Sequence, residues 1–293
     1  MSAKVSVIVN FHNSEKYLSE CIQSVLMQNY KNFEIILWDN NSEDKSKKII
    51  DTFRDDRIKY FKNSNKENLY KVRNMAIKKA TGEFIAFLDS DDWWEQNYLS
   101  SREDFFKNES YDYSYCNTNF FYEKLKKSKL YKTYKLPNGK IFDHLVRDYV
   151  IAISGVILRK KIFDKFGFFN EKYNIIGDYD FFLRIAKSAN AHSNDNPLLN
   201  YRVHNNNFSK LNSELFYEEY KHWFNSVKHK VNSKIKKNFR LRLEYLEITN
   251  LLLNRKKTLK ILIKILQHKN LMNKLKFLIL FFLPKRLFKF FKK

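Results

Sequence analysis

Short apolar runs alternate with amphipathic segments over the first 115 residues. The apolar runs have the length and composition of buried strands and lie at residues 4–9, 33–38, 58–61 and 84–88. Apolar residues recur at helical spacing in residues 17–26, 43–53 and 69–80. This alternation predicts an α/β fold, with right-handed crossovers and a mostly parallel central sheet that has helices on both faces.

The pattern is less regular farther along the chain. Residues 111–150 are rich in Tyr, Lys and Asn and predict no definite element. Beyond them we expect a strand at 154–159, a helical turn at 162–166, a helix at 178–188 and a strand at 198–203. From about residue 212 the pattern is helical and increasingly basic. We therefore expect one domain over residues 1–210 and a basic amphipathic helical tail over residues 211–293.

The composition narrows the class of protein. With 44% apolar side chains in 293 residues, the chain has ample material for a core and differs from disordered proteins. Its two cysteines, Cys21 and Cys116, lack metal or redox spacing, so we expect both to be core residues in a reducing compartment. The N-terminus has no charged-then-apolar signal segment, which favours a cytoplasmic location.

Positive charge is concentrated at one end of the chain. Residues 225–293 carry 20 Lys and Arg against Glu244 and Glu247, a net charge of +18. The total is +23, which leaves +5 for residues 1–224. Such asymmetry suggests two modules with different tasks.

The end of the basic tail contains an apolar run, residues 277–283, with basic residues on both sides. Seven residues are far fewer than the ~20 that a membrane-spanning helix needs. The composition favours a segment that lies in the interface of a membrane with anionic headgroups. The alternative is a helical hairpin that packs on the front domain and exposes a basic face. No nucleic-acid-binding motif is present, so we expect no nucleic-acid partner.

Three carboxylates cluster at residues 89–92, directly after the apolar run 84–88 and before two tryptophans. Like charges at this spacing raise each other's pKa unless a cation or strong donors hold them. Compact oxygen ligands suit Mg²⁺ or Mn²⁺, and the carboxyl end of a strand in an open α/β sheet is where ligands bind. The alternative is an acidic turn that caps a helix starting near Glu95.

Four ordered segments carry a family resemblance. They are VSVIVNFHNSEKYLSECIQSVLMQNYKNFEIILWDNNSED at 5–44, VRNMAIKKATGEFIAFLDSDDWW at 72–94, GDYDFFLRIA at 177–186 and YRVHNNNFS at 201–209. In this order and spacing they resemble the inverting glycosyltransferases of family 2, over roughly residues 4–208. The resemblance implies a GT-A fold, with a nucleotide-binding half at 1–115 and an acceptor half at 116–210.

The resemblance also implies an activity. The chain is expected to transfer a sugar from a nucleoside-diphosphate sugar, UDP-linked, to a hydroxyl of a glycan or lipid-linked saccharide. The expected cofactor is a divalent cation, Mg²⁺ or Mn²⁺. Together with the basic tail, this predicts a cytoplasmic enzyme that is peripheral on the inner face of the cell membrane and contacts its anionic surface.

The nucleotide would contact side chains on the first two strand ends and on one helix. Asp39 can accept a hydrogen bond from a base N–H such as the uracil imide, and the resemblance assigns it that role. Asn10 and His12 match positions that line the base pocket, although His12 departs from the usual Tyr. Arg73 matches an Arg that lies against the nucleotide. The alternatives are a turn residue for Asp39 and a solvated helix charge for Arg73.

The resemblance divides the acidic cluster into separate roles. Asp89 would face the ribose or the sugar, and Asp91 would bind the metal. Asp92 would support the loop or cap the following helix. Near the last strand, His204 would be a second metal ligand and Arg202 would meet the diphosphate. The alternative for His204 is a structural hydrogen-bonding group.

Inverting transfer needs a base that takes the proton of the acceptor hydroxyl. The resemblance assigns this role to Asp178, whose alternative is a helix cap. The family usually has Glu before this Asp, whereas this chain has Gly177, which we expect to leave more room near the acceptor. Asp180 should point away from Asp178 on the helix, and residues 154–155 are expected to shape the acceptor site.

Two other classes of protein remain as alternatives. A nucleotidyltransferase could use a similar sheet and acidic metal site, but it needs a Gly- or Lys-rich phosphate loop that residues 10–15 do not provide. A catalytically idle membrane adaptor could use the tail alone. The presence of Asp39, Asp91 and Asp178 argues against this second alternative.

Overall fold

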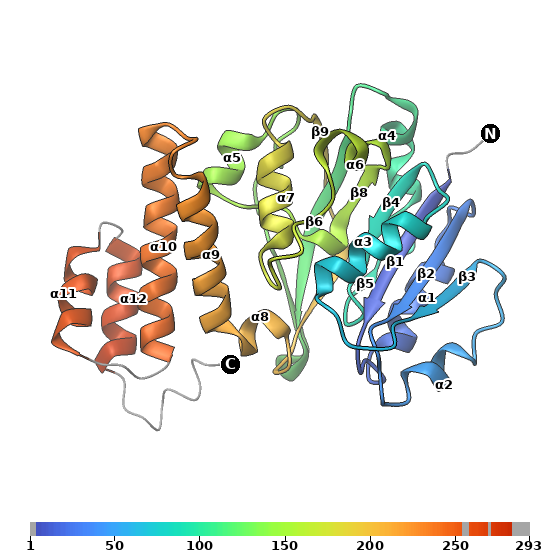
Figure 1. Cartoon of the computed structure of the whole chain (residues 1–293), viewed down its shortest axis with the longest axis horizontal. Coiled ribbons are helices and arrows are strands. Elements are labelled where there is room, and N and C mark those ends of the chain that lie inside the picture. The colour runs from blue at the N-terminus through green and yellow to red at the C-terminus, as the bar shows by residue number, and fades with distance from the viewer. Residues whose placement is uncertain (1–3, 254–257, 269–270, 283–293) are drawn as a thin grey trace. The chain divides into compact units, whose positions relative to one another are not determined.

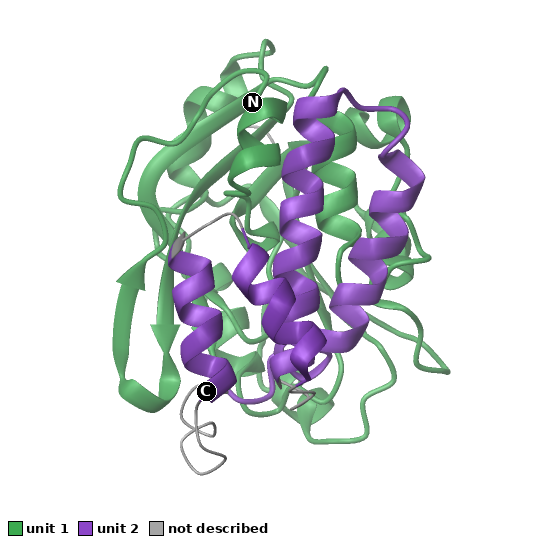
Figure 2. Cartoon of the chain, turned by 90° about the vertical axis from the view of Figure 1, so that its left-hand side faces the viewer, with its two compact units in different colours: residues 1–204 green, residues 205–293 purple. Residues whose placement is uncertain are grey.

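The computed structural model describes residues 4–253, 258–268 and 271–282. The chain divides into two compact units, Met1–His204 and Asn205–Lys293, which Figure 2 shows in different colours. Each unit has its own hydrophobic core.

The first half of unit 1 is the parallel part of a mixed sheet (Figure 1). Its strands, in spatial order, are β3 (Ile58–Lys62), β2 (Phe33–Asp39), β1 (Val5–Phe11) and β4 (Phe84–Phe87). The connecting helices are α1 (Leu18–Leu26), α2 (Ser46–Ile50) and α3 (Leu69–Lys79). All four strands lie where the apolar runs predicted them, and all three neighbouring pairs are parallel.

The second half continues the sheet with mixed strand directions, so the parallel arrangement holds for the first four strands. Its strands follow β4 in the order β8 (Val156–Arg159), β6 (Tyr113–Tyr122), β9 (Ala191–Val203) and β5 (Trp93–Trp94), with β7 (Lys127–Leu130) beside β6. β8 is antiparallel to both neighbours, whereas β6 and β9 are parallel. The helices are η1 (Ser100–Arg102), α4 (Glu103–Lys107), η2 (Glu123–Leu125), α5 (Phe142–Arg147), η3 (Ile153–Gly155), α6 (Lys161–Phe166) and α7 (Gly177–Ile185).

Two local predictions need correction. The helix expected over 43–53 is only five residues long (Ser46–Ile50), and the Asp44 carboxylate before it accepts from the backbone N–H of Ser46. No helix starts near Glu95, because residues 93–94 form β5 and pair with β9. The Trp94 indole N–H donates to the carbonyl of Ser154 at 2.6 Å, which ties this segment to the sheet.

The core of unit 1 lies between the sheet and its helices. Every residue of β1, β2 and β4 is buried. On α1, the apolar face packs into this core and includes Cys21. Both cysteines are buried and unpaired, as expected for core residues.

Unit 2 is helical over its described residues. It contains α8 (Phe208–Leu211), α9 (Ser213–Val227), α10 (Ser233–Leu253), α11 (Leu259–Gln267) and α12 (Leu271–Phe282). α9 packs on α10, and α10, α11 and α12 share a small apolar core. Within the described ranges, no helix has the length and hydropathy needed to cross a bilayer. Residues 283–293, which include the end of the predicted interfacial segment, lie outside the described residues.

Candidate active site

The carboxyl ends of the parallel strands carry the polar loops. Asp39 ends β2 directly beside Phe11 of β1, and residues 89–92 follow β4 on the other side of β1. The Ser14 and Ser90 hydroxyls, which are 2.8 Å apart, connect the β1 loop to the acidic loop. The loops after β1, β2 and β4 therefore open at the same edge of the sheet.

The expected base pocket contains one buried carboxylate and one unpaired amide. Asp39 is fully buried and accepts from the Ser42 backbone N–H (2.6 Å) and from the Tyr60 hydroxyl (2.9 Å). His12 is held through Nδ1, which lies 3.0 Å from a backbone carbonyl. The buried Nδ2 of Asn10 has no hydrogen-bond partner among the described residues. A buried donor of this kind is suited to a ligand that brings its own acceptor.

Asp92 is the structural carboxylate of the acidic loop. It is buried, and it accepts from the Ser154 hydroxyl and from the backbone N–H of Arg202, each at 2.9 Å. Burial, together with the charges of Asp91 and Asp89, raises the pKa of Asp92 well above its usual range. Asp92 therefore supports the loop and does not cap a helix.

Arg202 also holds the acidic loop in this structure. Its Nε donates to the carbonyl of Asp91 at 2.9 Å, and its guanidinium pairs with Glu20. The guanidinium carbon lies 4.7 Å and 4.4 Å from the ring centroids of Tyr17 and Trp93. The contact of Arg202 with a diphosphate stays a prediction, since these contacts place the side chain against the loop.

The two predicted metal ligands lie together. Nε2 of His204 is 2.8 Å from Oδ2 of Asp91, and the ring of Tyr17 lies 4.9 Å from the imidazole. No group of three or more His, Cys, Asp or Glu side chains in the described ranges could hold a metal ion. A carboxylate and an imidazole nevertheless suit a Mg²⁺ or Mn²⁺ ion whose remaining ligands are water and substrate phosphates. The donor set therefore fits the expected cofactor.

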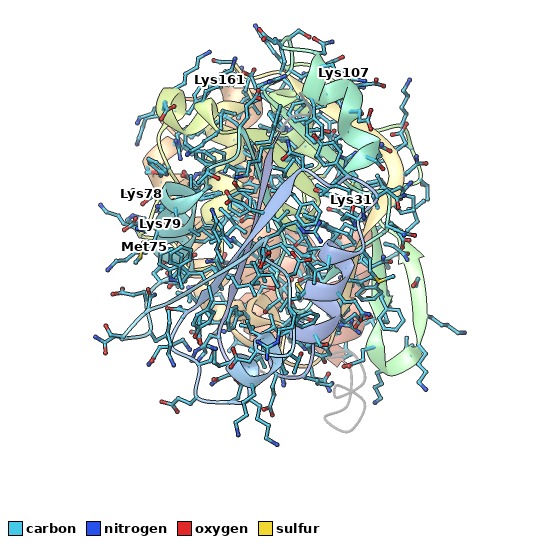
Figure 3. The ribbon with its side chains drawn as sticks, turned by 90° about the vertical axis from the view of Figure 1, so that its right-hand side faces the viewer. Lys31, Met75, Lys78, Lys79, Lys107 and Lys161 are labelled. Atoms are coloured by element: carbon cyan, nitrogen blue, oxygen red, sulfur yellow. The ribbon has the colours of Figure 1, made fainter. Side chains whose placement is uncertain are left out.

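Arg73 connects the two sides of the site. Its guanidinium is buried, donates to Asp89 at 2.5 Å and lies over the ring of Tyr70. Lys78 and Lys79 on the same helix are exposed at the periphery of unit 1 (Figure 3). Arg73 is therefore not the solvated helix charge that was its alternative.

Asp178 lies in the first turn of α7. Its Oδ1 is 3.0 Å from the Tyr70 hydroxyl. Burial raises the pKa of the Asp178 carboxyl, and the nearby charge of Arg73 opposes this rise. Asp180 pairs with Arg184 on the same helix, which agrees with the expectation that it points elsewhere.

The expectation for Gly177 is wrong. A Cβ atom at this position would lie 2.6 Å from ring carbons of Tyr70. The space that the missing side chain leaves is filled by the Tyr70 ring and is not free for an acceptor.

The sequence did not indicate the role of Tyr70, nor the hydrogen bonds that Ser154 makes to the acidic loop. Tyr70 lies three residues before Arg73, which puts both on one helix face, and this spacing was the available signal. Ser154 accepts from the backbone N–H of Asp89 at 3.1 Å and donates to Asp92. It therefore orders the acidic loop, whereas its part in an acceptor site stays a prediction.

The chain matches a known protein family and several characterised relatives. Residues 6–167 match the model of the family described as Glycosyl transferase family 2. Two Escherichia coli relatives, WfgD and WfaP, are described as UDP-Glc:alpha-D-GlcNAc-diphosphoundecaprenol beta-1,3-glucosyltransferases. WfgD is 32% identical over 187 residues, 64% of this chain and 71% of the relative. WfaP is 33% identical over 203 residues, 68% of this chain and 77% of the relative.

Solved structures share the fold. S. aureus TarS 1-349 in complex with UDP-GlcNAc has a TM-score of 0.66 at 20% identity, over 97% of this chain and 82% of that chain. The mannosyltransferase PcManGT from Pyrobaculum calidifontis, in complex with GDP-Man and Mn²⁺, has a TM-score of 0.63 at 13% identity, over 100% and 84%. The fold is thus the GT-A type of nucleotide-sugar transferases, with a helical C-terminal region.

Proposed function

Because the chain belongs to glycosyl transferase family 2 and is therefore a glycosyltransferase, we propose that it transfers a sugar from UDP to a hydroxyl of a lipid-linked saccharide, with inversion at the anomeric carbon. The observation that carries this proposal is the position of Arg73. Its guanidinium pairs with Asp89 of the acidic loop, and its charge also acts on Asp178. The buried guanidinium of Arg73 thus interacts with both the acidic loop on the donor side and the candidate base.

The donor and acceptor classes are supported by the relatives. The names of WfgD and WfaP specify UDP-Glc as donor and a GlcNAc-diphosphoundecaprenol acceptor. TarS has been solved with UDP and with UDP-GlcNAc. In this chain, Asp39 and Asn10 would contact the base, and His12 would line the same pocket. Residues 1–115 would form the nucleotide-binding half and residues 116–210 the acceptor half.

Asp178 would act as the general base. As the acceptor oxygen attacks the anomeric carbon, the new C–O bond forms opposite the C–O bond to the diphosphate, which breaks. UDP leaves with the bonding electron pair, and the hydroxyl proton moves to the Asp178 carboxylate. The raised pKa of Asp178 suits a proton acceptor, while the charge of Arg73 favours the ionised form before reaction.

The acidic loop would position the leaving group. Asp91 and His204 would hold Mg²⁺ or Mn²⁺, which when bound supplies a Lewis acid beside the diphosphate. Asp89 would contact the ribose or sugar while paired with Arg73. Asp92 and Arg202 keep the loop in one conformation, so that these contacts need no rearrangement.

A donor screen tests the proposal. Purified full-length protein is incubated with UDP-, GDP- and dTDP-sugars and a GlcNAc-diphosphate-lipid acceptor, and products are identified by mass spectrometry and NMR. We expect a UDP-α-sugar to give a β-linked product. No transfer from any donor, or an α-linked product, would contradict the proposal. Release of pyrophosphate from a nucleoside triphosphate and a sugar phosphate would instead support a nucleotidyltransferase.

Membrane contact through unit 2 is a second part of the proposal. On α11, Leu259, Ile263 and Leu266 are exposed at helical spacing. On α12, the exposed apolar side chains are Met272, Leu275, Ile279 and Phe282. Lysines lie between them on both helices, and this combination suits a surface with anionic headgroups. We place the enzyme on the inner face of the cell membrane, where a lipid-linked acceptor would be presented.

A further inference from the structure

The hydroxyl of Tyr70 has two acceptors within reach. Its Oη lies 2.7 Å from the carbonyl oxygen of Ile175 and 3.0 Å from Oδ1 of Asp178. A phenol carries one hydrogen, so it donates to only one of these oxygens at a time. The oxygen that does not receive this hydrogen has no hydrogen bond from Tyr70 at that moment.

We propose that Tyr70 is a positioning residue that changes its hydrogen-bond partner with the protonation state of Asp178. The inference rests on the proposed function, in which Asp178 is the general base. While Asp178 is ionised, Tyr70 donates to its Oδ1 and holds the carboxylate in place. After Asp178 has taken the acceptor proton, its Oδ1 is a weaker acceptor, and Tyr70 donates to the carbonyl of Ile175 instead.

The change needs only a rotation about the phenol C–O bond. The tyrosine keeps its own hydrogen throughout, and the proton gained by Asp178 comes entirely from the acceptor hydroxyl. No bond to the ring breaks, and no charge passes through it. Burial and the neighbouring charge of Asp178 raise the pKa of Tyr70 well above its usual range, which keeps the phenol protonated.

The ring of Tyr70 is fixed from several sides. Its side chain is buried, and the guanidinium of Arg73 lies 5.3 Å from its centroid. Phe169 packs on it at 5.6 Å. The close approach of Gly177, where a Cβ would come within 2.6 Å of the ring, leaves no space for a side chain there. Gly177 and Tyr70 therefore form a matched pair: the glycine admits the ring that delivers a hydroxyl to the next residue, Asp178.

Other charged and titratable groups also face Asp178. Arg73 on α3 lowers its pKa, and Asp89 on the acidic loop raises it. Tyr201 on β9 also interacts with Asp178, because the charge of Asp178 contributes to the raised pKa of the Tyr201 phenol. None of these groups changes in a Tyr70→Phe variant, so a shift of the pH profile in this variant reports the missing hydroxyl.

Tyr70→Phe keeps the ring and removes only the hydroxyl. We expect kcat to fall about tenfold with the donor KM unchanged, because a base that is held less precisely slows proton transfer. The acidic limb of the kcat profile should move to higher pH, since the ionised carboxylate loses a donor. Thermal stability should change little. Tyr98→Phe is the matched control, because Tyr98 is buried and its hydroxyl has no partner among the described residues.

A second variant distinguishes action through Asp178 from a general packing effect. In an Asp178→Asn background, Tyr70→Phe should cause no further loss of the residual rate. An unchanged kcat and pH profile for Tyr70→Phe, beside an inactive Asp178→Asn, would overturn this inference alone. Wild-type transfer by Asp178→Asn would overturn the assignment of the base and this inference together.

The matched pair has its own test. Gly177→Ala should lower the thermal midpoint by more in the wild-type background than in a Tyr70→Ala background, because the smaller side chain removes the overlap. Activity should stay low in the double variant, since the hydroxyl is absent. A stable and fully active Gly177→Ala variant would contradict the close packing on which the inference depends.

Discussion

The pKa of Glu34, at one edge of the parallel sheet, is shifted in the opposite direction from those of Asp92 and Asp178 on the side of the candidate site. At the amino edge, Glu34 is the second residue of β2 and accepts from Ser6 (2.5 Å), Lys59 (2.5 Å) and both the backbone N–H and hydroxyl of Thr81 (2.7 and 2.8 Å). Burial alone would raise the pKa of Glu34, but these hydrogen bonds lower it to about 2. The Glu34 carboxylate is therefore ionised at neutral pH.

On the side of the candidate site, Asp92 and Asp178 accept fewer hydrogen bonds than Glu34 does. Burial raises the pKa of both Asp92 and Asp178, and neither has a lysine or arginine as a direct salt-bridge partner among the described residues. A carboxylate with a raised pKa retains affinity for a proton, whereas Glu34 has almost none at neutral pH. Asp92 uses its hydrogen bonds to hold the acidic loop, so among these three carboxylates only Asp178 combines a raised pKa with a proposed role in catalysis.

Asp91→Asn should give the largest effect after that of Asp178→Asn. We expect transfer to fall about a hundredfold, because one of the two proposed protein ligands of the cation is lost. Higher Mn²⁺ should partly restore the rate, and chelation should abolish wild-type transfer. The unfolding midpoint should stay near that of the wild type, as in an Asp56→Asn control on the surface. Wild-type transfer in the presence of a chelator would show that no cation is needed.

Glu34→Gln should have the opposite effect, on stability and not on the specific activity of folded enzyme. The folded pKa of about 2 lies below the ordinary value of 4.5. The ionised Glu34 therefore stabilises the fold above about pH 4.5, and this contribution is lost as the pH falls from about 4.5 to 2. We expect a loss of about 2 kcal/mol at pH 7, about 30-fold in the unfolding equilibrium.

Denaturant unfolding of wild type and Glu34→Gln at pH 7 and pH 3 measures this effect. The difference in stability should shrink at the lower pH. Glu83→Gln is a suitable control, because Glu83 is an exposed acid paired with Arg159 on the same sheet. A difference that does not depend on pH would contradict the structural role given to this edge.

The parallel half of the fold could be predicted because each strand is a continuous apolar run. β6 was not predicted, because its ten residues mix Tyr, Ser, Asn and Phe. β5 was not predicted either, because two residues are too few to define a pattern. Pairing of β5 with β9 joins positions about 105 residues apart, which only tertiary packing decides.

The candidate site shows the same limit. Motif spacing located Asp39, Asp91 and Asp178, but it did not indicate what holds them. The contact between Tyr70 and Asp178 spans 108 residues. Reading Gly177 as open space failed because the residue that fills the space belongs to another helix. Glu34 was not singled out either, since one acid within an apolar strand resembles an edge residue until its partners are known.

The smallest expected effect lies outside both edges, in unit 2. Replacing Met272 and Ile279 with Gln removes two exposed apolar side chains from α12. We expect binding to vesicles that contain anionic lipid to weaken about tenfold, with transfer to a water-soluble acceptor unchanged. Met27→Gln, at an exposed apolar residue of unit 1, is the matched control. Unchanged vesicle binding would contradict membrane contact through this helix.

The most direct test of the carboxyl edge compares Asp178→Asn with Asp180→Asn. The two aspartates are two residues apart on α7, but Asp178 contacts Tyr70 and lies near the charge of Arg73, whereas Asp180 pairs with Arg184. Transfer from a UDP-sugar and binding of that donor are measured on both variants. We predict that Asp178→Asn binds the donor as the wild type does but transfers about a thousandfold more slowly, while Asp180→Asn stays within about threefold of the wild-type rate. Wild-type transfer by Asp178→Asn, or an equal loss in both variants, would contradict the assignment of Asp178 as the base.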